Sequence, residues 1–218
     1  MSEIRVEVDR GVAVLTLAAP ERRNAFTSAM VRELLDACDA IDADLSVGAV
    51  VVQAEGQSFC SGAHRQSLAD AGQDPAHPDR YRSLGETYSA FVRVGNLLPP
   101  TIAAVRGHAV GAGVNLMLAT DLRIVSEGAR IITRFLQIGL HPGGGHFTLL
   151  ARVAGREAAA AMSLFGEEIS GRRAVEVGLA WEALPEAEVE PRAIELARAA
   201  AADPELARAA VRSLRLEL

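Results

Sequence analysis

The sequence is poor in the features that mark several large classes of protein. It has 2 cysteines, Cys38 and Cys60, in 218 residues, too few for a disulfide or metal-binding framework. No apolar run approaches the roughly 20 residues that span a bilayer. Residues 1–9 are charged and alternating, unlike a signal peptide. With 22 basic and 28 acidic residues, the net charge of −6 disfavours a nucleic acid partner. We therefore expect a cytoplasmic protein without nucleic acid or membrane partners.

Half of the residues are hydrophobic, which is enough for one well-buried core. Alternating residues predict a hairpin over residues 4–16 with its turn at 9–11, and the apolar β-branched run at 49–52 predicts a buried strand. Residues 64–78 have no clear period and predict a loop. The remaining expectations are helices at 27–42, 81–94, 148–162, 174–177, 191–202 and 204–216, strands at 101–105, 122–125, 130–133 and near Trp181, and caps at Thr27 or Ser28, Ser170 and Asp203.

The most informative stretch is residues 101–121, TIAAVRGHAVGAGVNLMLATD. A short apolar strand is followed by Gly107, Gly111 and Gly113, and then by an apolar pattern with helical spacing. Such a junction leaves backbone N–H groups unpaired at the positive end of a helix, where an oxygen carrying negative charge is well placed. Dinucleotide and phosphate-loop motifs do not fit, because Leu116 stands at the third glycine position and Gly-Lys-Ser/Thr is absent. The stretch therefore favours an oxyanion hole, which needs a second N–H donor.

A second donor is available in the segment 59–64, FCSGAH, which follows the buried strand at 49–52. Here too a strand gives way to small residues and a glycine. From the pattern alone, two ordinary βα turns explain both segments equally well.

Three further segments decide between these readings: PERRNA at 20–25, GLHPG at 139–143 and GRRAVEVG at 171–178. In this order, and with the two segments above, they resemble the motifs of the crotonase (enoyl-CoA hydratase/isomerase) superfamily. The resemblance runs over about residues 6–202, and His64 stands where the family usually has aspartate.

The resemblance implies an α/β fold, a crotonase-like spiral of ββα units with C-terminal helices. Residues 1–190 would form the core domain and residues 191–218 a C-terminal helical segment, apparently shortened relative to the family. The family assembles as trimers or dimers of trimers, so a homotrimer or hexamer is implied.

Substrates of the family are acyl-CoA thioesters, and no cofactor beyond the CoA moiety is implied. Two backbone N–H groups hold the thioester oxygen while enolate charge develops, and position matching puts these donors on Ala63 and Ala112. The other substrate-binding positions implied by the resemblance are Arg23, Asn24, Ala25, Ser61, Gly62, Gly111, Asn115 and Phe135.

The two glutamates that serve hydration in the family fall on Asn115 and Phe135, neither of which can exchange a proton. A third acidic position, used by some relatives, falls near Gly143. Standard hydration is therefore not expected. His64, His141 and His146 are candidate acid–base residues, because histidine titrates near neutral pH, although single loop histidines are more often structural or exposed. Asp121 matches a family aspartate and is expected to be structural. No metal site is expected.

Three functions stay open at this point. The first is an acyl-CoA enzyme that works mainly by enolate stabilisation, including a decarboxylase or C–C hydrolase. The second is a non-catalytic acyl-CoA-binding subunit, and the third is a structural paralogue without a ligand. The intact glycine loops argue against the third.

Overall fold

The computed structural model describes residues 2–63 and 78–217, and for residues 78–84 it describes the backbone alone. His64 and the loop expected at residues 64–78 therefore lie outside the described residues, except for Pro78. Pro78 begins helix α3 (Pro78–Gly95), so this helix starts three residues earlier than expected. No described helix is long and apolar enough to cross a membrane.

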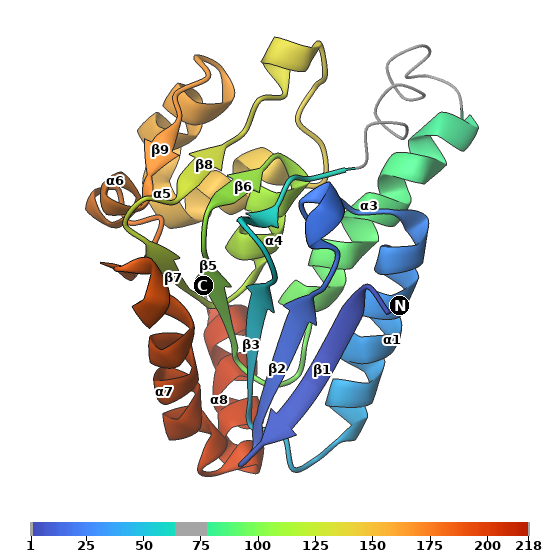
Figure 1. The fold of residues 1–218 in the computed structure, drawn as a ribbon, viewed down its shortest axis with the longest axis vertical. Helices are drawn as coiled ribbons and strands as arrows, with labels where there is room; N and C mark the ends of the chain where they lie inside the picture. Colours follow the sequence, from blue (N-terminus) through green and yellow to red (C-terminus); the bar gives the residue numbers. More distant parts are fainter. Residues whose placement is uncertain (1, 64–77, 218) are drawn as a thin grey trace.

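A six-stranded sheet forms the centre of the fold (Figure 1). Its strands pair in the order β1-β2-β3-β5-β7-β10, with β1 and β2 antiparallel and the other pairs parallel. The inner strands are buried on both faces, which explains their continuous apolar, β-branched sequences. The bounds are β1 (Ile4–Asp9), β2 (Val12–Leu17), β3 (Ala49–Ala54), β5 (Thr101–Val105), β7 (Leu122–Ser126) and β10 (Glu182–Leu184). The predicted hairpin is thus confirmed. Trp181 was expected in a strand, but it lies just before β10.

A second, four-stranded sheet lies at one end of the first, towards the top of Figure 1. Its order is β4-β6-β8-β9, for strands β4 (Ser58–Cys60), β6 (His108–Val110), β8 (Arg130–Ile132) and β9 (Ile169–Ser170). Strands β3, β5 and β7 of the large sheet each continue, after a few residues, into β4, β6 and β8 of the small one. The strand β6, which lies between Gly107 and Gly111, was not predicted from the sequence. The repeated strand pairs confirm the predicted ββα spiral.

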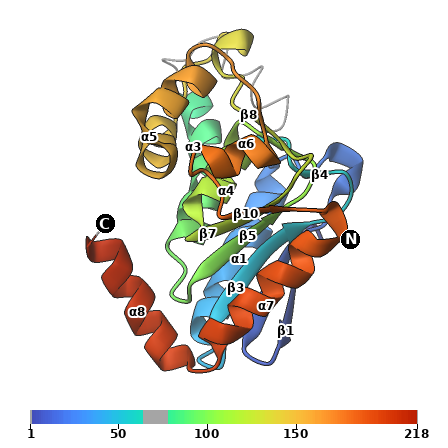
Figure 2. The same cartoon turned by 90° about the vertical axis from the view of Figure 1, so that its left-hand side faces the viewer.

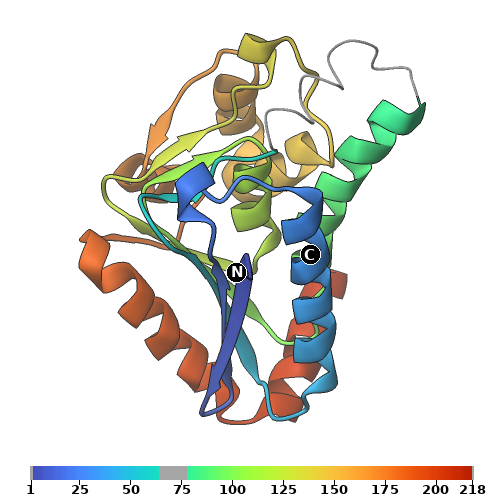
Figure 3. The ribbon, with the colours of Figure 1, turned by 45° about the vertical axis from the view of Figure 1, so that its right-hand side comes forward.

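Helices cover both faces of the large sheet (Figure 3). On one face lie α1 (Ser28–Ala43) and α3, and α4 (Ala112–Ala119) is packed among α3, α5 (His146–Ser163), β4 and β6. Seven of the eight α4 residues are buried, so this helix has no polar face. α4 is the central helix of the core (Figure 1).

The opposite face is covered by α7 (Val189–Ala201), whose Val189, Ala193, Ala197 and Ala201 pack on the sheet. The domain boundary expected at residue 190 thus falls inside a helix that packs with the core. Helix α8 (Pro204–Glu217) extends away from the sheet (Figure 2). Arg215 ties it back by donating to Leu97 O at 2.6 Å and to both carboxylate oxygens of Asp121. Asp121 also accepts from the N–H and hydroxyl of Thr101, which confirms its structural role.

Helix caps lie at the predicted residues. Thr27 accepts from Met30 N at 3.1 Å, Ser170 accepts from Arg173 N at 3.2 Å to begin α6 (Gly171–Glu176), and Asp203 accepts from Leu206 N at 3.0 Å. Helix α5 differs from expectation, because it begins two residues earlier, at His146, and bends at Gly155. The short 3-10 helices are η1 (Pro20–Arg22), η2 (Leu136–Ile138) and η3 (Glu186–Glu188).

Candidate active site

A cavity of about 90 Å³ lies where the small sheet meets α3 and α4. The residues that line it come from four segments far apart in the sequence, and none of those described is an aspartate or glutamate. The candidate residues that the structure brings together on this cavity are Ser61, Gly62, Ala63, Gly111, Ala112, Phe135 and His141. Sequence reasoning missed the other lining residues, which are Thr87, Tyr88, Val110, Thr133, Arg134, Ile138 and Leu140.

One wall of the cavity is the start of α4. Ala112 is the first helical residue, and Gly111 before it has φ 55° and makes no side-chain cap. The first N–H groups of a helix have no intrahelical acceptor, and the helix dipole places positive charge there. Gly111 N donates to Ile132 O of β8 at 2.9 Å. The Ala112 N–H is therefore available to a ligand in the cavity.

The adjacent wall is the end of β4. Phe26 N donates to Gly62 O at 2.8 Å, and Ala63 pairs with Phe26 in a parallel bridge. Gly62 has φ 90°, and a Cβ placed on it would be 2.7 Å from Val110 O and 3.3 Å from Ala112 N. Only glycine permits this close approach. The backbones of Gly62–Ala63 and of Ala112 therefore meet at one cavity.

The segment 22–25 supports β4 from outside the cavity. Asn24 is fully buried and its side chain is saturated: Oδ1 accepts from Ala19 N, and Nδ2 donates to Glu55 O and Ser58 O, each at 2.9 Å. Arg23 O accepts from Ser61 N at 3.0 Å. Arg23, Asn24 and Ala25 do not line the cavity, and the Asn24 side chain holds the backbone around β4. Their expected contact with the substrate stays a prediction.

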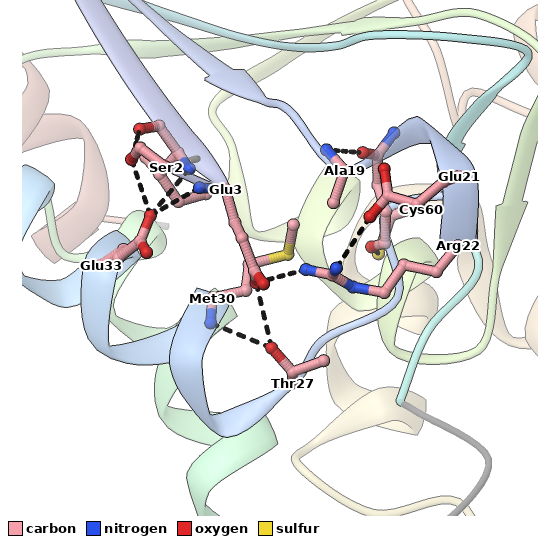
Figure 4. Close-up of polar contacts among 11 residues, drawn as sticks. Ser2, Glu3, Ala19, Glu21, Arg22, Thr27, Met30, Glu33 and Cys60 are labelled. Carbon is pink, nitrogen blue, oxygen red and sulfur yellow. Dashed lines mark hydrogen bonds and ion pairs between the residues drawn. The ribbon is translucent and has the colours of Figure 1, made fainter.

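Beside this segment, charged side chains fasten the N-terminus to α1 (Figure 4). The Glu3 carboxylate pairs with Arg22 and accepts from Thr27 Oγ1 at 3.0 Å, and Thr27 in turn caps α1. Cys60 is buried against Asn24 O, and burial raises the pKa of its thiol to about 12. This thiol is therefore not an activated nucleophile.

Behind the cavity lies a chain of three buried polar side chains, each 1 % exposed. His146 Nδ1 is 2.6 Å from Asn115 Oδ1, and His146 Nε2 is 3.0 Å from Ser163 Oγ. The Phe135 ring, which lines the cavity, contacts the imidazole at a centroid distance of 4.8 Å. Asn115 and His146 thus stand one layer behind the cavity wall.

The bend at Gly155 makes this chain possible. His146 and Ser163 are the first and last residues of α5, and a straight helix would separate them by about 26 Å. Gly155 has φ 80° and ψ 169°, so the two halves of α5 fold back on each other. Sequence reasoning missed Ser163, because nothing near it in the sequence indicates this contact.

The two candidate histidines that the structure describes have different surroundings. Burial lowers the pKa of His146 to about 4, so the ring is neutral near pH 7, with both nitrogens engaged. Its geometry therefore suits hydrogen bonding better than proton exchange. His141 is exposed at the cavity, with its ring 6.1 Å from that of Phe147.

Comparisons with known proteins agree with this architecture. The profile of the enoyl-CoA hydratase/isomerase family matches residues 7–216. A probable enoyl-CoA hydratase of Mycobacterium tuberculosis is 43 % identical over 177 residues, covering 81 % of this chain and 68 % of the relative. The 1,2-epoxyphenylacetyl-CoA isomerase of Escherichia coli is 35 % identical, covering 94 % and 78 %.

Solved structures give the same result. The enoyl-CoA hydratase of Bacillus anthracis superposes with a TM-score of 0.89 at 27 % identity, covering 98 % of this chain and 82 % of that one. Family profile, relatives and fold agree, and this chain belongs to the enoyl-CoA hydratase/isomerase family.

Proposed function

We propose that the chain is an acyl-CoA enzyme that holds the thioester oxygen with the N–H groups of Ala63 and Ala112 while enolate charge develops. The observation that supports this most directly is the meeting of Gly62–Ala63 with Ala112 on one cavity. Donors fixed in this way interact more strongly with the enolate than with the ground-state thioester, and each typically contributes about 3 kcal/mol to the transition state. Any residue other than proline supplies an N–H, so alanine at both positions is compatible with the role.

The proposed reaction generates the enolate without removing a proton. Hydration needs groups that deliver water and exchange protons, yet Asn115 and Phe135 occupy the matching positions, and the described cavity residues include no carboxylate. In a decarboxylation or C–C cleavage, the bond between C2 and C3 breaks and its electron pair enters the thioester enolate. The C3 group leaves as carbon dioxide or as an acyl group taken up by water, and C2 is protonated from solvent. This chemistry needs less acid–base apparatus and no cofactor other than the CoA moiety. A non-catalytic acyl-CoA-binding subunit is the alternative, favoured by the same two residues.

The test compares hydration of crotonyl-CoA with decarboxylation of malonyl-CoA and methylmalonyl-CoA. We expect hydration to be slower than in an ordinary hydratase by about 10²-fold or more, because each positioned acid–base group contributes about that factor. Acetyl-CoA formation from malonyl-CoA supports the enzyme. Binding of the thioesters without turnover supports the alternative, and hydration at an ordinary hydratase rate contradicts the proposed chemistry.

We also propose that the chain acts in the cytoplasm and assembles as a trimer or hexamer. Helix α8 presents Leu206, Leu214 and Leu216 at 64 %, 48 % and 82 % exposure, and an apolar groove of about 560 Å³ runs between α7 and α8. Apolar surface of this kind favours contact with another subunit. Light scattering that shows a stable monomer would count against the assembly.

A further inference from the structure

The cavity has an arginine in its wall that the proposed chemistry does not use. Among the described residues that line the cavity, Arg134 alone carries a permanent charge, because a guanidinium is not deprotonated in proteins. Many of its neighbours in the wall are apolar, as at Val110, Phe135 and Leu140. The described part of the wall therefore has a fixed positive charge and no carboxylate.

The backbone turns sharply at Arg134 and brings three consecutive residues to the cavity. In an extended strand, successive side chains point to opposite faces. Strand β8 ends at Ile132, and Thr133, Arg134 and Phe135 all line the cavity. Arg134 has φ 53°, in the left-handed region that residues with a Cβ rarely adopt. This conformation keeps Arg134 on the cavity wall, where a continued strand would turn alternate residues away.

The acidic side chain near Arg134 is already bound by another arginine. Glu168 forms an ion pair with Arg130 of β8. The hydrogen bond from Arg130 lowers the pKa of the Glu168 carboxyl, and the charges of Arg130 and Arg134 lower it further. Among the side chains that the structure describes, none forms an ion pair or hydrogen bond with that of Arg134. Two arginines therefore share the field of one carboxylate, and the guanidinium of Arg134 is available to a ligand.

The start of α4 adds positive charge to the same cavity. Its first N–H groups lie at Ala112 on the cavity wall, and the helix dipole makes this end of the helix positive. Positive charge in a hollow with apolar walls attracts negatively charged ligands. In the proposed site, the thioester oxygen bound at Ala63 and Ala112 is neutral before the reaction. A second negative group of the ligand would therefore complement the charge of Arg134.

We infer that Arg134 binds a carboxylate on the acyl group, so that the preferred ligands are CoA thioesters of dicarboxylic acids. This inference rests on the proposed acyl-CoA site. The planar guanidinium matches a carboxylate with two parallel N–H···O hydrogen bonds. The CoA phosphates are the other negative groups of such a ligand, but the pantetheine arm separates them from the thioester. Arg134 lies on the same cavity as Ala63 and Ala112, which places it beside the acyl group.

The test uses pairs of thioesters that differ in charge but not in shape. Succinyl-CoA is paired with 4-methylpentanoyl-CoA, and glutaryl-CoA with 5-methylhexanoyl-CoA, so that two methyl groups replace the two carboxylate oxygens. Two chain lengths are needed because an arginine side chain is flexible. In both acids the carboxylate lies beyond C3, so the proposed decarboxylation does not consume these ligands. Titration calorimetry measures the four dissociation constants for each protein.

Three variants are compared with the wild type. Arg134→Gln removes the charge, and Arg134→Lys keeps the charge but loses the planar pair of donors. Arg152→Gln is the matched control, because it removes the same charge from an exposed residue of α5 that does not line the cavity. Circular dichroism checks that each variant is folded.

We expect the wild type and Arg152→Gln to bind the acidic member of at least one pair more tightly than the neutral member. Arg134→Gln should weaken binding of that acidic thioester about tenfold, the loss typical of one hydrogen bond to a charged group, and change the neutral one less than about twofold. Arg134→Lys should lose less than Arg134→Gln.

Four results would overturn the inference. The first is equal or weaker wild-type binding of the acidic member at both chain lengths, which needs no variant to fold. The second is an equal loss for both members of a pair in Arg134→Gln, because Arg134 would then bind the phosphates that both share. The third is no change in Arg134→Gln, which leaves the proposed acyl-CoA site intact. The fourth is a wild type that binds none of the thioesters, in which case the proposed acyl-CoA site fails as well.

Discussion

The buried imidazole of His146 predicts a specific loss of stability in mild acid. Burial holds its pKa at about 4 in the folded protein, against about 6.5 for an unperturbed histidine in the unfolded chain. Above pH 6.5 the ring is neutral in both states and contributes nothing to the pH dependence. As the pH falls from 6.5 towards 4, the unfolded state takes up a proton that the folded state does not. The free energy of unfolding therefore decreases through this window.

The magnitude follows from these two pKa values. At pH 4.5 the unfolded chain is favoured by a factor of about (1 + 10²)/(1 + 10⁻⁰·⁵), roughly 80-fold, which is about 2.6 kcal/mol. Below pH 4 both states bind the proton, and the loss levels off at about 3.4 kcal/mol. This is a large fraction of the total stability of a typical domain.

The assay is urea denaturation at pH 7.0 and pH 4.5. The difference between the wild type and His146→Gln isolates the contribution of His146 to the pH dependence of stability from that of the carboxylates, which titrate in the same pH range. The variant is expected to be less stable at pH 7.0, because it disturbs the hydrogen bonds to Asn115 and Ser163, yet to lose about 2–3 kcal/mol less on acidification. His141→Gln replaces an exposed histidine and should keep the wild-type pH dependence. Equal losses for the wild type and His146→Gln would refute the reasoning.

Three further substitutions test the packing around the site, each by chemical or thermal denaturation. Gly113→Ala should destabilise the protein by about 3 kcal/mol, because the added Cβ would be 2.2 Å from Cys60 O. A Cβ added at Gly128 has no atom within 4 Å, so Gly128→Ala should be nearly neutral. Similar effects of the two substitutions would contradict the packing. Asn24→Ala removes three hydrogen bonds from a buried site and should cost about 3 kcal/mol, and a loss below 1 kcal/mol would mean that the surrounding backbone re-pairs. Thr27→Ala removes the cap of α1 and should cost about 1 kcal/mol, and an unchanged midpoint would show that the cap is dispensable.

Features determined by neighbours in the sequence were predicted well. The hairpin turn forms at Arg10 and Gly11, which have φ values of 47° and 77°, as the tight connection of twisted strands demands. The caps at Thr27 and Asp203 depend on a side chain and an N–H three residues apart. In each case the interacting groups lie within one turn of chain, so a sequence pattern contains all the information.

Of the small sheet, β8 was predicted, as the strand at 130–133, but the other three strands could not be found in this way. Its strands β4, β6 and β8 have three residues each and β9 has two, too few to display an alternating pattern. They pair with strands about 20 to 50 residues away, so their pairing follows from the way the spiral stacks its turns. The glycines around them were read as loop signals for the same reason.

The same distinction explains which site residues could be predicted. Ala63 and Ala112 were chosen by position matching to the family, and the structure brings both residues to one cavity. Their predicted role uses only backbone N–H groups, which do not depend on the side chain. Side-chain roles depend on distant partners. His146 was expected as an acid–base candidate, but it begins α5 and is enclosed by Asn115 and Ser163. That enclosure requires the bend at Gly155. In a sequence, a glycine inside a helical pattern indicates a loss of helix stability, and it does not predict that the chain reverses direction. The sequence therefore predicts part of the cavity wall, whereas the polar chain behind it forms only when the two halves of α5 pack together.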